Sequence, residues 1–250
     1  MTNSRSISVA LASCDGERWI QDQVESILSQ LGPDDELVVA DASSTDRTLE
    51  ILAAVSDSRL RILRDLPRGD IPGSFERALV ECRGDVLFLS DQDDVWLPGK
   101  VELCLRTLEA TGASLVVHDA RIVDEVGRVV AESFMDLRRF RPGFFRNLWK
   151  PGYLGCALAF RRELLALALP FPKNLPMHDW WLGLLAEGLA GVEMVRTPLI
   201  LHRRHGGNAN FDPGESPYGP GRRLGFRLRM AKALLFRPLG HRSARRSKDP

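Results

Sequence analysis

Three carboxylates stand within four residues in the segment Ser90-Asp91-Gln92-Asp93-Asp94. Carboxylates this close together repel one another unless a cation or hydrogen-bond donors compensate their charge. Oxygen ligands of this type suit Mg²⁺ or Mn²⁺, and both ions also bind diphosphates. An acidic surface turn is the alternative, but the apolar run Val86-Leu87-Phe88-Leu89 leads directly out of the core into the carboxylates. The segment therefore predicts a metal site that can bind a diphosphate.

A second polar cluster, Asp41-Ala42-Ser43-Ser44-Thr45-Asp46, directly follows the apolar segment Glu36–Ala40. Acidic residues at the end of a parallel strand lie where open α/β sheets bind ligands. The alternative is a helix-entry loop in which Ser44 or Thr45 only caps the helix expected over Thr45–Val55. Taken alone, this cluster leaves both interpretations open.

Two later segments carry groups for acid–base and phosphate chemistry. His178-Asp179 follows a Pro-rich loop and opens a predicted helix. An acid there either favours the helix dipole or acts as a general base toward a hydroxyl. The segment from Arg203 to Asn208 combines cations and an imidazole with glycines. It is either a solvated basic loop or a site where His205 approaches a metal or diphosphate while Arg203 or Arg204 neutralises phosphate charge.

Alternating strands and helices must position these groups in the first half of the chain. Apolar runs predict buried strands, and apolar residues at helical spacing, as from Ile20 to Leu31, predict helices. The expected fold class is α/β, with a mostly parallel central sheet and helices on both faces. The expected strands are 7–12, 36–40, 60–63, 85–89 and 115–118, and the later helices are 45–55, 75–82 and 101–108.

The pattern changes after His118. A hairpin is expected from 121–123 and 129–131, and the aromatic, basic segment 134–151 is expected to be irregular. One domain with an elaborated second half accounts best for this pattern. The remaining expected elements are a strand over 155–160, a helix through Leu167, a helix over 180–189 and a strand over 192–196.

Composition narrows the class of protein. The 250 residues are 44% hydrophobic and 27% charged, which is typical of a globular domain. Aromatic residues are only 7%, which argues against an aromatic-lined nucleic-acid platform, and no nucleic-acid partner is expected. The four cysteines show neither a CxxC pair nor metal-type spacing, so buried free thiols are expected. With a polar N-terminus and no long apolar run, we expect a cytoplasmic protein.

The C-terminal segment differs in charge from the rest of the chain. From Gly221 to Pro250 there are ten Lys or Arg residues against one acid, so the remaining residues carry a net charge of −8. Leucines and phenylalanines alternate with these cations, as in a basic amphipathic helix on an anionic membrane. A disordered basic tail and a nucleic-acid contact are the alternatives. We expect peripheral contact with the inner face of an anionic membrane through 221–248.

Several of these motifs together resemble a known family. The segment from Ile7 to Trp96 resembles the nucleotide-binding half of family 2 glycosyltransferases, which are inverting enzymes of the GT-A fold. His178-Asp179-Trp180-Trp181 and the segment from Arg203 to Asn208 follow in the order and separation of the rhamnosyltransferase-like branch. The matching residues of the first half are Val9 to Ser13 with Asp15-Gly16-Glu17, Asp41 with Ser44-Thr45-Asp46, and Asp85 to Trp96.

For the donor, the resemblance implies a metal bound directly by Asp93, with Asp91 and His205 as further metal ligands. It implies that Asp41 contacts the nucleotide base. The residues implied for the nucleotide-sugar site are Ser13, Asp15, Asp41, Asp91, Asp94 and Arg203. Ala42, Ser43 and His202 depart from the family pattern, because relatives commonly carry an acid or amide, a Gly and a Tyr at these positions.

For the acceptor, the resemblance implies that Asp179 is the general base and that Gly155 lies nearby. An inverting transfer needs one carboxylate to remove the proton of the acceptor hydroxyl as that oxygen attacks the anomeric carbon. Trp180 and Trp181 are expected in the acceptor region. Because adjacent residues of a helix point in different directions, one of the two is expected in the core and the other against a sugar ring.

The resemblance implies one GT-A domain over 1–212, with a nucleotide-binding half at about 1–118, an acceptor half at 119–212, and a basic tail over 213–250. The implied reaction moves a sugar from a nucleoside-diphosphate donor to a hydroxyl of a glycan or lipid-linked acceptor, with Mn²⁺ or Mg²⁺, in cell-surface polysaccharide synthesis. dTDP-rhamnose is the favoured donor, ahead of UDP-galactose and UDP-glucose. A nucleotidyltransferase of related fold and a non-catalytic nucleotide-sugar-binding module are the alternatives.

Overall fold

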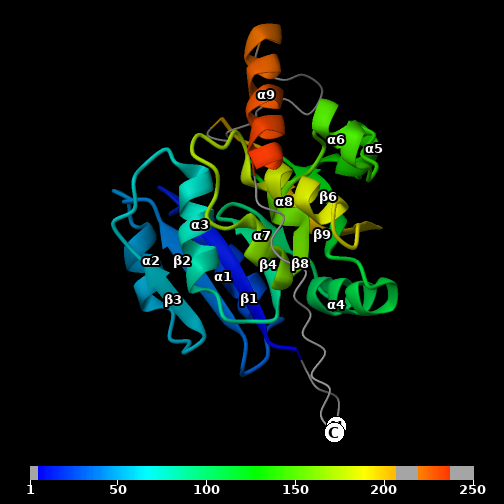
Figure 1. The fold of residues 1–250 in the computed structure, drawn as a ribbon. Helices are drawn as coiled ribbons and strands as arrows, with labels where there is room; N and C mark the ends of the chain where they lie inside the picture. The colour runs from blue at the N-terminus through cyan, green and yellow to red at the C-terminus, as the bar shows by residue number, and fades with distance from the viewer. Residues whose placement is uncertain (1–4, 207–218, 237–250) are drawn as a thin grey trace, which may run out of the picture.

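A computed structural model describes residues 5–206 and 219–236 (Figure 1). Its central feature is one sheet, in the order β3-β2-β1-β4-β8-β6-β9-β5, with β7 also paired to β6. The nine strands that form it in the described residues are β1 (Ile7–Ser13), β2 (Glu36–Asp41), β3 (Leu60–Leu63), β4 (Val86–Asp91), β5 (Val95–Trp96), β6 (Leu115–Val123), β7 (Val129–Ala131), β8 (Leu158–Arg161) and β9 (Val192–Arg203).

The sheet is mostly parallel, as the sequence predicts. Strands β3, β2, β1, β4, β6 and β9 run in one direction, and β5, β7 and β8 run in the opposite direction. Because β1 is parallel to both β2 and β4, Ser13 lies level with Asp41 and Ala12 lies level with Asp91. The parallel register thus brings both acidic strand ends to one edge of the sheet.

Helices cover both faces of the sheet, because its central strands are apolar on both sides. Along β1, Val9 and Leu11 belong to the core under one face, and Ala10 belongs to the core under the other. The first core also contains residues of α1 (Ile20–Leu28), α2 (Thr48–Ala54) and α4 (Lys100–Thr111). The second contains residues of α3 (Ile71–Glu81), α7 (Glu163–Ala168) and α8 (His178–Glu187).

Two predicted boundaries near the site are wrong. Helix α2 begins at Thr48, and neither Ser44 nor Thr45 caps it; the Asp46 carboxylate instead accepts the backbone N–H of Thr48 at 2.9 Å. Strand β9 continues to Arg203, seven residues beyond the predicted end at Arg196. It does so because β6 is itself long, and the two strands stay paired past a register shift as far as Val123 and Arg203.

The segment expected to be irregular contains two short helices, α5 (Phe134–Arg138) and α6 (Phe144–Trp149). The expected strand from Gly155 begins only at Leu158, after the 3-10 turn η1 (Gly155–Ala157). The predicted hairpin forms, since β6 and β7 pair in antiparallel fashion. The helix expected over 180–189 is α8, which begins and ends two residues earlier.

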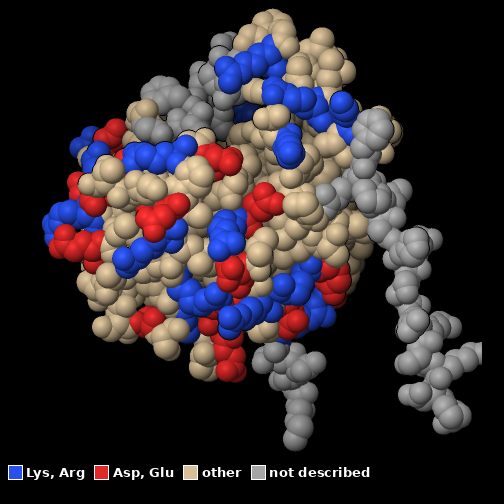
Figure 2. All heavy atoms as spheres, turned by 60° about the vertical axis from the view of Figure 1, so that its left-hand side comes forward, with Lys and Arg blue, Asp and Glu red and all other residues tan. Residues whose placement is uncertain are grey.

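The described part of the basic tail is helix α9 (Pro220–Phe236), which stands at the top of the view in Figure 1. Met230 is fully buried, and α9 contacts α6. Lys and Arg side chains gather at this end of the molecule in Figure 2. Residues 213–218 and 237–250 of the predicted tail lie outside the described residues. Within 5–206 and 219–236, none of the helices has both the length and the apolar character needed to cross a bilayer.

Candidate functional site

Asp41, at the end of β2, ties two strand ends together. The Ser13 hydroxyl donates to its Oδ2 at 2.8 Å, and the Ser44 hydroxyl donates to the same oxygen at 2.6 Å. The Ser44 backbone N–H donates to Oδ1 at 2.8 Å. Asp41 is fully buried, so in this structure its carboxylate holds the β1 and β2 loops together. Its predicted contact with a nucleotide base stays a prediction.

Asp15 lies in the exposed loop after β1, with a left-handed backbone conformation (φ 50°). Its Oδ1 accepts the backbone N–H of Thr45 at 2.8 Å, and its carboxylate pairs with the Arg68 guanidinium. The hydrogen bond from Arg68 lowers the pKa of Asp15 to about 2. Arg68 also donates to the Ser43 carbonyl at 2.8 Å, so it links the loop after β1 to the loop after β2. Arg68 carries no motif in the sequence that would identify it as part of this site.

Two glutamines hold the acidic turn after β4, and neither was identified from the sequence. The Gln92 amide donates to the Cys14 carbonyl at 2.9 Å and accepts the Cys14 N–H at 2.7 Å. Gln23, fully buried in α1, donates to the Asp91 carbonyl at 2.9 Å and to the Ser90 hydroxyl. The only indication in the sequence for Gln92 is its position between Asp91 and Asp93. Gln23 has no such indication, because a glutamine is common in helices.

The carboxylates of the turn repel one another. Burial, followed by the charges of Asp94 and Asp93, raises the pKa of Asp91 to about 8. The Lys100 ammonium is fully buried, donates to the Cys156 carbonyl at 2.9 Å, and its own pKa is lowered by burial to about 8. The mutual repulsion that raises the pKa of Asp91 would be relieved by a divalent cation, because a cation favours the ionised form of a carboxylate. The turn is therefore suited to bind one.

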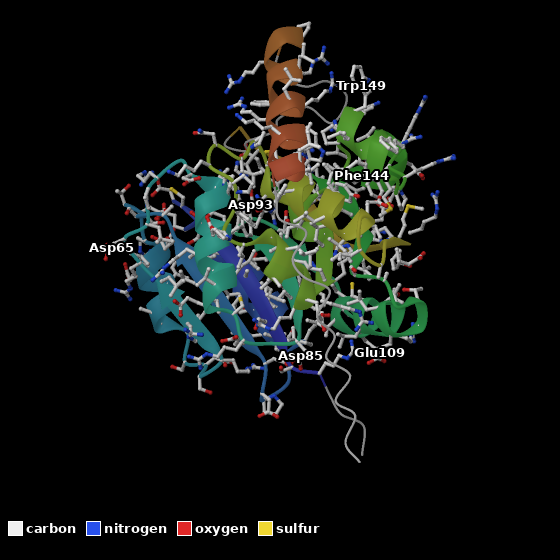
Figure 3. The ribbon with its side chains drawn as sticks, in the orientation of Figure 1. Asp65, Asp85, Asp93, Glu109, Phe144 and Trp149 are labelled. Carbon is white, nitrogen blue, oxygen red and sulfur yellow. The ribbon has the colours of Figure 1, made fainter. Side chains whose placement is uncertain are left out.

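Asp93 (labelled in Figure 3) and His205 form the most direct contact across the site. His205 Nε2 lies 2.7 Å from Asp93 Oδ2, and both side chains are mostly buried. The Trp19 ring lies 4.3 Å from the His205 ring, centroid to centroid. Carboxylate oxygens from Asp91 and Asp93 with one imidazole nitrogen are a donor set that suits Mn²⁺ or Mg²⁺. The residues present therefore fit the predicted metal.

Arg203, which was predicted to contact phosphate, donates instead to backbone carbonyls in this structure. Its side chain is buried, its Nε donates to the Asp93 carbonyl at 3.0 Å, and its Nη1 donates to the Glu125 carbonyl at 3.2 Å. These contacts hold the backbone of Asp93 against the end of β9. Arg203 thus supports the acidic turn in this structure, and its predicted contact with phosphate stays a prediction.

Asp94 is fully buried and joins the turn to β9. Its Oδ1 lies 2.9 Å from His202 Nδ1 and accepts the backbone N–H of Arg203 at 3.1 Å. Potential metal-ligand atoms of Asp94, Cys156 and His202 all lie within 4.8 Å of one another. Burial raises the pKa of Cys156 well above its ordinary value, which keeps the sulfur a thiol and a poor ligand. We interpret these three residues as an internal brace.

Asp179 opens α8 and lies at the same site as the acidic turn. It is buried, its Oδ1 accepts the backbone N–H of Trp180 at 2.7 Å, and burial raises its pKa to about 6. It therefore remains ionised at neutral pH. Its charge is among the causes that raise the pKa of Asp91, and η1, which lies against Asp179 at Gly155, also contacts β4, the strand that ends at Asp91.

Gly155 lies against His178 and Asp179. A Cβ on Gly155 would approach His178 Nε2 to 3.0 Å and Asp179 Cβ to 3.7 Å. The His178 ring stacks on Phe75 with centroids 4.0 Å apart, and burial lowers its pKa to about 3, so it is neutral. Neither of its ring nitrogens has a hydrogen-bond partner among the described residues. The glycine leaves room for this unpaired imidazole beside Asp179.

The expectation that one tryptophan faces a sugar is wrong for this structure. Trp180 and Trp181 are both buried, because α8 packs against α6 on one side and α7 on another. The Trp180 indole donates to the Asn147 carbonyl at 2.9 Å, and the Trp181 indole donates to the Ala168 carbonyl at 3.1 Å. Both rings belong to the core and anchor the helix that begins with Asp179.

The acidic turn lies at the carboxyl edge of an α/β sheet, and a second buried acid, Asp179, comes from the C-terminal half of the chain. This is the arrangement of nucleotide-diphospho-sugar transferases with the GT-A fold. The family model described as "Glycosyl transferase family 2" matches residues 8–167. The chain belongs to this family. The match favours the glycosyltransferase interpretation over the nucleotidyltransferase alternative.

Curated relatives come from the same group of enzymes. The dTDP-rhamnosyl transferase RfbG of Shigella flexneri is 25% identical over 79% of this chain and 72% of its own length. A glucosyltransferase of Escherichia coli, WfgD, is 27% identical over 72% of this chain and 70% of its own length. An uncharacterized glycosyltransferase of Nostoc is 22% identical over 81% of this chain and 66% of its own length. The chain thus spans about two thirds of these relatives.

Solved structures confirm the fold. TarS of S. aureus, solved with UDP-GlcNAc, superimposes with a TM-score of 0.71 at 18% identity, over 94% of this chain and 68% of that one. Glucosyl-3-phosphoglycerate synthase of Mycobacterium tuberculosis, solved with Mn²⁺, UDP and phosphoglyceric acid, gives a TM-score of 0.58 at 25% identity, over 94% and 78%.

Proposed function

We propose that the protein transfers a sugar, with inversion, from a nucleoside-diphosphate donor to a hydroxyl of a glycan or lipid-linked acceptor in cell-surface polysaccharide synthesis. The observation that carries this proposal is the contact of Asp93 with His205 in the turn that also contains Asp91, and the buried Asp179 carboxylate, whose charge acts on Asp91, supports it. Asp91, Asp93 and His205 would bind the metal and with it the diphosphate of the donor. Asp179 would accept the proton of the acceptor hydroxyl.

Asp93, Asp91 and His205 would hold Mn²⁺ or Mg²⁺, which supplies Lewis-acid stabilisation of the departing diphosphate. Ser13, Asp15 and Asp41 line the neighbouring strand ends, where the nucleoside would lie. Asp94 and Arg203 keep the turn in place through their contacts with β9. Gln92 fixes the same turn to the end of β1.

Asp179 acts as the general base. The acceptor oxygen attacks the anomeric carbon in line, its proton moves to the Asp179 carboxylate, and the bond from that carbon to the diphosphate oxygen breaks. The nucleoside diphosphate leaves with the electron pair of that bond. The pKa of about 6 suits this role, because the group is ionised at neutral pH yet basic enough to accept a proton in the transition state.

The relatives guide the choice of donor. The Shigella flexneri relative is named a dTDP-rhamnosyl transferase, and the Escherichia coli relative is named for UDP-Glc and an undecaprenol-linked acceptor. We place dTDP-rhamnose first and UDP-glucose and UDP-galactose after it. A lipid-linked acceptor would place the protein on the cytoplasmic face of a membrane, with the basic C-terminal segment in contact with lipid.

Product analysis with a panel of nucleotide sugars, Mn²⁺ or Mg²⁺ and a lipid-linked acceptor tests this function. Release of free nucleoside diphosphate that is lost in Asp93→Ala and Asp179→Asn, and kept in the exposed control Asp22→Ala, is the expected result. Release of pyrophosphate would identify a nucleotidyltransferase. Binding without turnover would identify a non-catalytic module.

A further inference from the structure

Two helices that are far apart in the sequence form one surface at the top of the molecule (Figure 1). Arg227 of α9 donates from its Nε to the Trp149 carbonyl of α6 at 2.8 Å, and its guanidinium lies 4.1 Å from the centroid of the Trp149 ring. Met230, one turn further along α9, is fully buried. Helix α9 is therefore attached to the domain through a defined contact with α6.

Large apolar side chains stand exposed around this contact. Phe145 is 83% exposed and Trp149 is 66% exposed, and the spacing of four residues places them on one face of α6. On α9, Leu224 is 49% exposed and Leu228 is 63% exposed, and their spacing of four residues places them on one face of the helix, beside Arg227 in the sequence. Single exposed apolar residues are ordinary, but a group gathered around one interhelical contact marks an interaction surface.

The same surface is strongly basic. Residues 137–150 contain five Arg or Lys residues and no acid, and residues 220–236 also contain five and no acid. The whole chain carries a net charge of only +1, so positive charge is concentrated here (Figure 2). Aromatic and leucine side chains interspersed with guanidinium groups match the interface of an anionic bilayer, where rings enter the headgroup layer and cations meet phosphate.

The surface also lies on the side to which the active-site edge opens. In Figure 3, Asp85 at the start of β4 is low in the molecule, Asp93 after its end is higher, and Phe144 and Trp149 lie above Asp93. A bilayer that touched α6 and α9 would therefore lie beyond the carboxyl edge of the sheet. That edge is where a membrane-held acceptor would need to approach Asp179, so the orientation rests on the proposed function.

We propose that the exposed faces of α6 and α9, defined by Phe145, Trp149, Leu224, Leu228 and the neighbouring arginines, dock the protein on an anionic phospholipid bilayer. From the sequence, lipid contact is predicted only for the C-terminal segment. The structure adds α6, which lies about 70 residues earlier and supplies the two aromatic rings. The docking surface is thus a property of the folded domain, in addition to any contribution of the basic residues after 236.

Flotation of the full chain with vesicles tests the proposal without donor or acceptor. The vesicles are phosphatidylcholine alone, or phosphatidylcholine mixed with phosphatidylglycerol. We expect binding to the mixed vesicles alone, and at least tenfold weaker binding for Phe145→Glu and for Leu228→Glu. The matched control is Val130→Glu, which changes an equally exposed apolar residue on β7. Arg222→Glu should weaken binding, whereas Arg64→Glu, an exposed arginine elsewhere, should weaken it less.

Several outcomes would overturn the proposal. Wild-type affinity in Phe145→Glu and Leu228→Glu, with loss of binding only after removal of 237–250, would assign the contact to the terminal tail. Binding to a short duplex RNA but not to mixed vesicles would assign the surface to nucleic acid. Asp93→Ala should bind vesicles as the wild type does, so failure of the proposed catalysis and failure of the docking surface are separable. Circular dichroism and Tm confirm that each variant is folded.

Discussion

His202 and Asp94 form a buried pair that joins the acidic turn to the end of β9, with Nδ1 and Oδ1 2.9 Å apart. The residues are 108 positions apart in the chain. Burial lowers the pKa of His202, but the Asp94 carboxylate outweighs it, and the net pKa lies above its ordinary value. The pair therefore holds Asp93, one residue before Asp94, in register with His205, three residues after His202.

The first prediction concerns this pair. His202→Phe leaves the buried Asp94 carboxylate without its main partner, and removing one member of a buried pair costs about 3 kcal/mol of unfolding free energy or more. His202→Tyr should cost less, because a phenol hydroxyl can donate to Asp94. Urea denaturation of the two variants, which differ in one hydroxyl group, measures the difference. Equal stability of both would show that Asp94 does not depend on a donor at position 202.

The second prediction concerns the repulsion among the carboxylates in the absence of metal. The folded-state pKa of Asp91, about 8, lies above its unfolded value of about 3.9. The fold therefore binds this proton more tightly, and the stability it contributes is complete at low pH and is lost as pH rises toward about 8. Without metal, the wild type should lose more stability between about pH 5 and pH 8 than Asp91→Asn. Identical urea midpoints across that range would contradict the assignment.

The third prediction concerns divalent metal, which should stabilise the wild-type fold more than it stabilises variants of the acidic turn. Mn²⁺ with a nucleoside diphosphate should raise the Tm of the wild type and raise that of Asp91→Asn or Asp93→Ala much less, because ligands that bind only the folded state stabilise it. We expect Asp93→Ala to lower kcat by about 10²-fold or more. A thermal-shift titration and steady-state kinetics check both statements, with Asp22→Ala as the control on the exposed side of α1.

The fourth prediction concerns Asp179, the proposed general base. Asp179 must be ionised to accept a proton, so kcat/KM should fall about tenfold per pH unit below its pKa of about 6. Asp179→Asn should lower kcat by about 10²- to 10⁴-fold while donor affinity stays near the wild-type value. A pH profile that stays flat down to pH 5 would point to another base.

Gly155 supplies a prediction about the acceptor side. Gly155→Ala places a Cβ 3.0 Å from His178 Nε2, so the imidazole or the Asp179 backbone must shift. We expect a lower kcat/KM for the acceptor and an unchanged Kd for the donor nucleotide. Combining Gly155→Ala with His178→Ala should cost less than the sum of the single changes, because the second change removes the clash. Strict additivity in this double-mutant cycle would show that the contact does not matter.

Much of the fold and part of the site followed from local patterns. The strands leading to Asp41 and Asp91 were predictable because buried parallel strands are continuous apolar runs, and the acidic turn was visible because its charges are adjacent. The expected caps at Ser44 and Thr45 do not form. The Ser44 hydroxyl instead donates to Asp41 of the same loop, and the Thr45 hydroxyl donates to Asp15 of the loop after β1.

The sequence by itself determined most of the strands and long helices, which acids end the strands, and that the tail is basic, since these depend on residues near one another in the chain. Only the tertiary structure decided that Asp94 pairs with His202, that Trp180 and Trp181 are both buried, and that α6 meets α9. Such contacts join residues separated by tens of positions. Their energies depend on packing and on the exclusion of water, which no local spacing records.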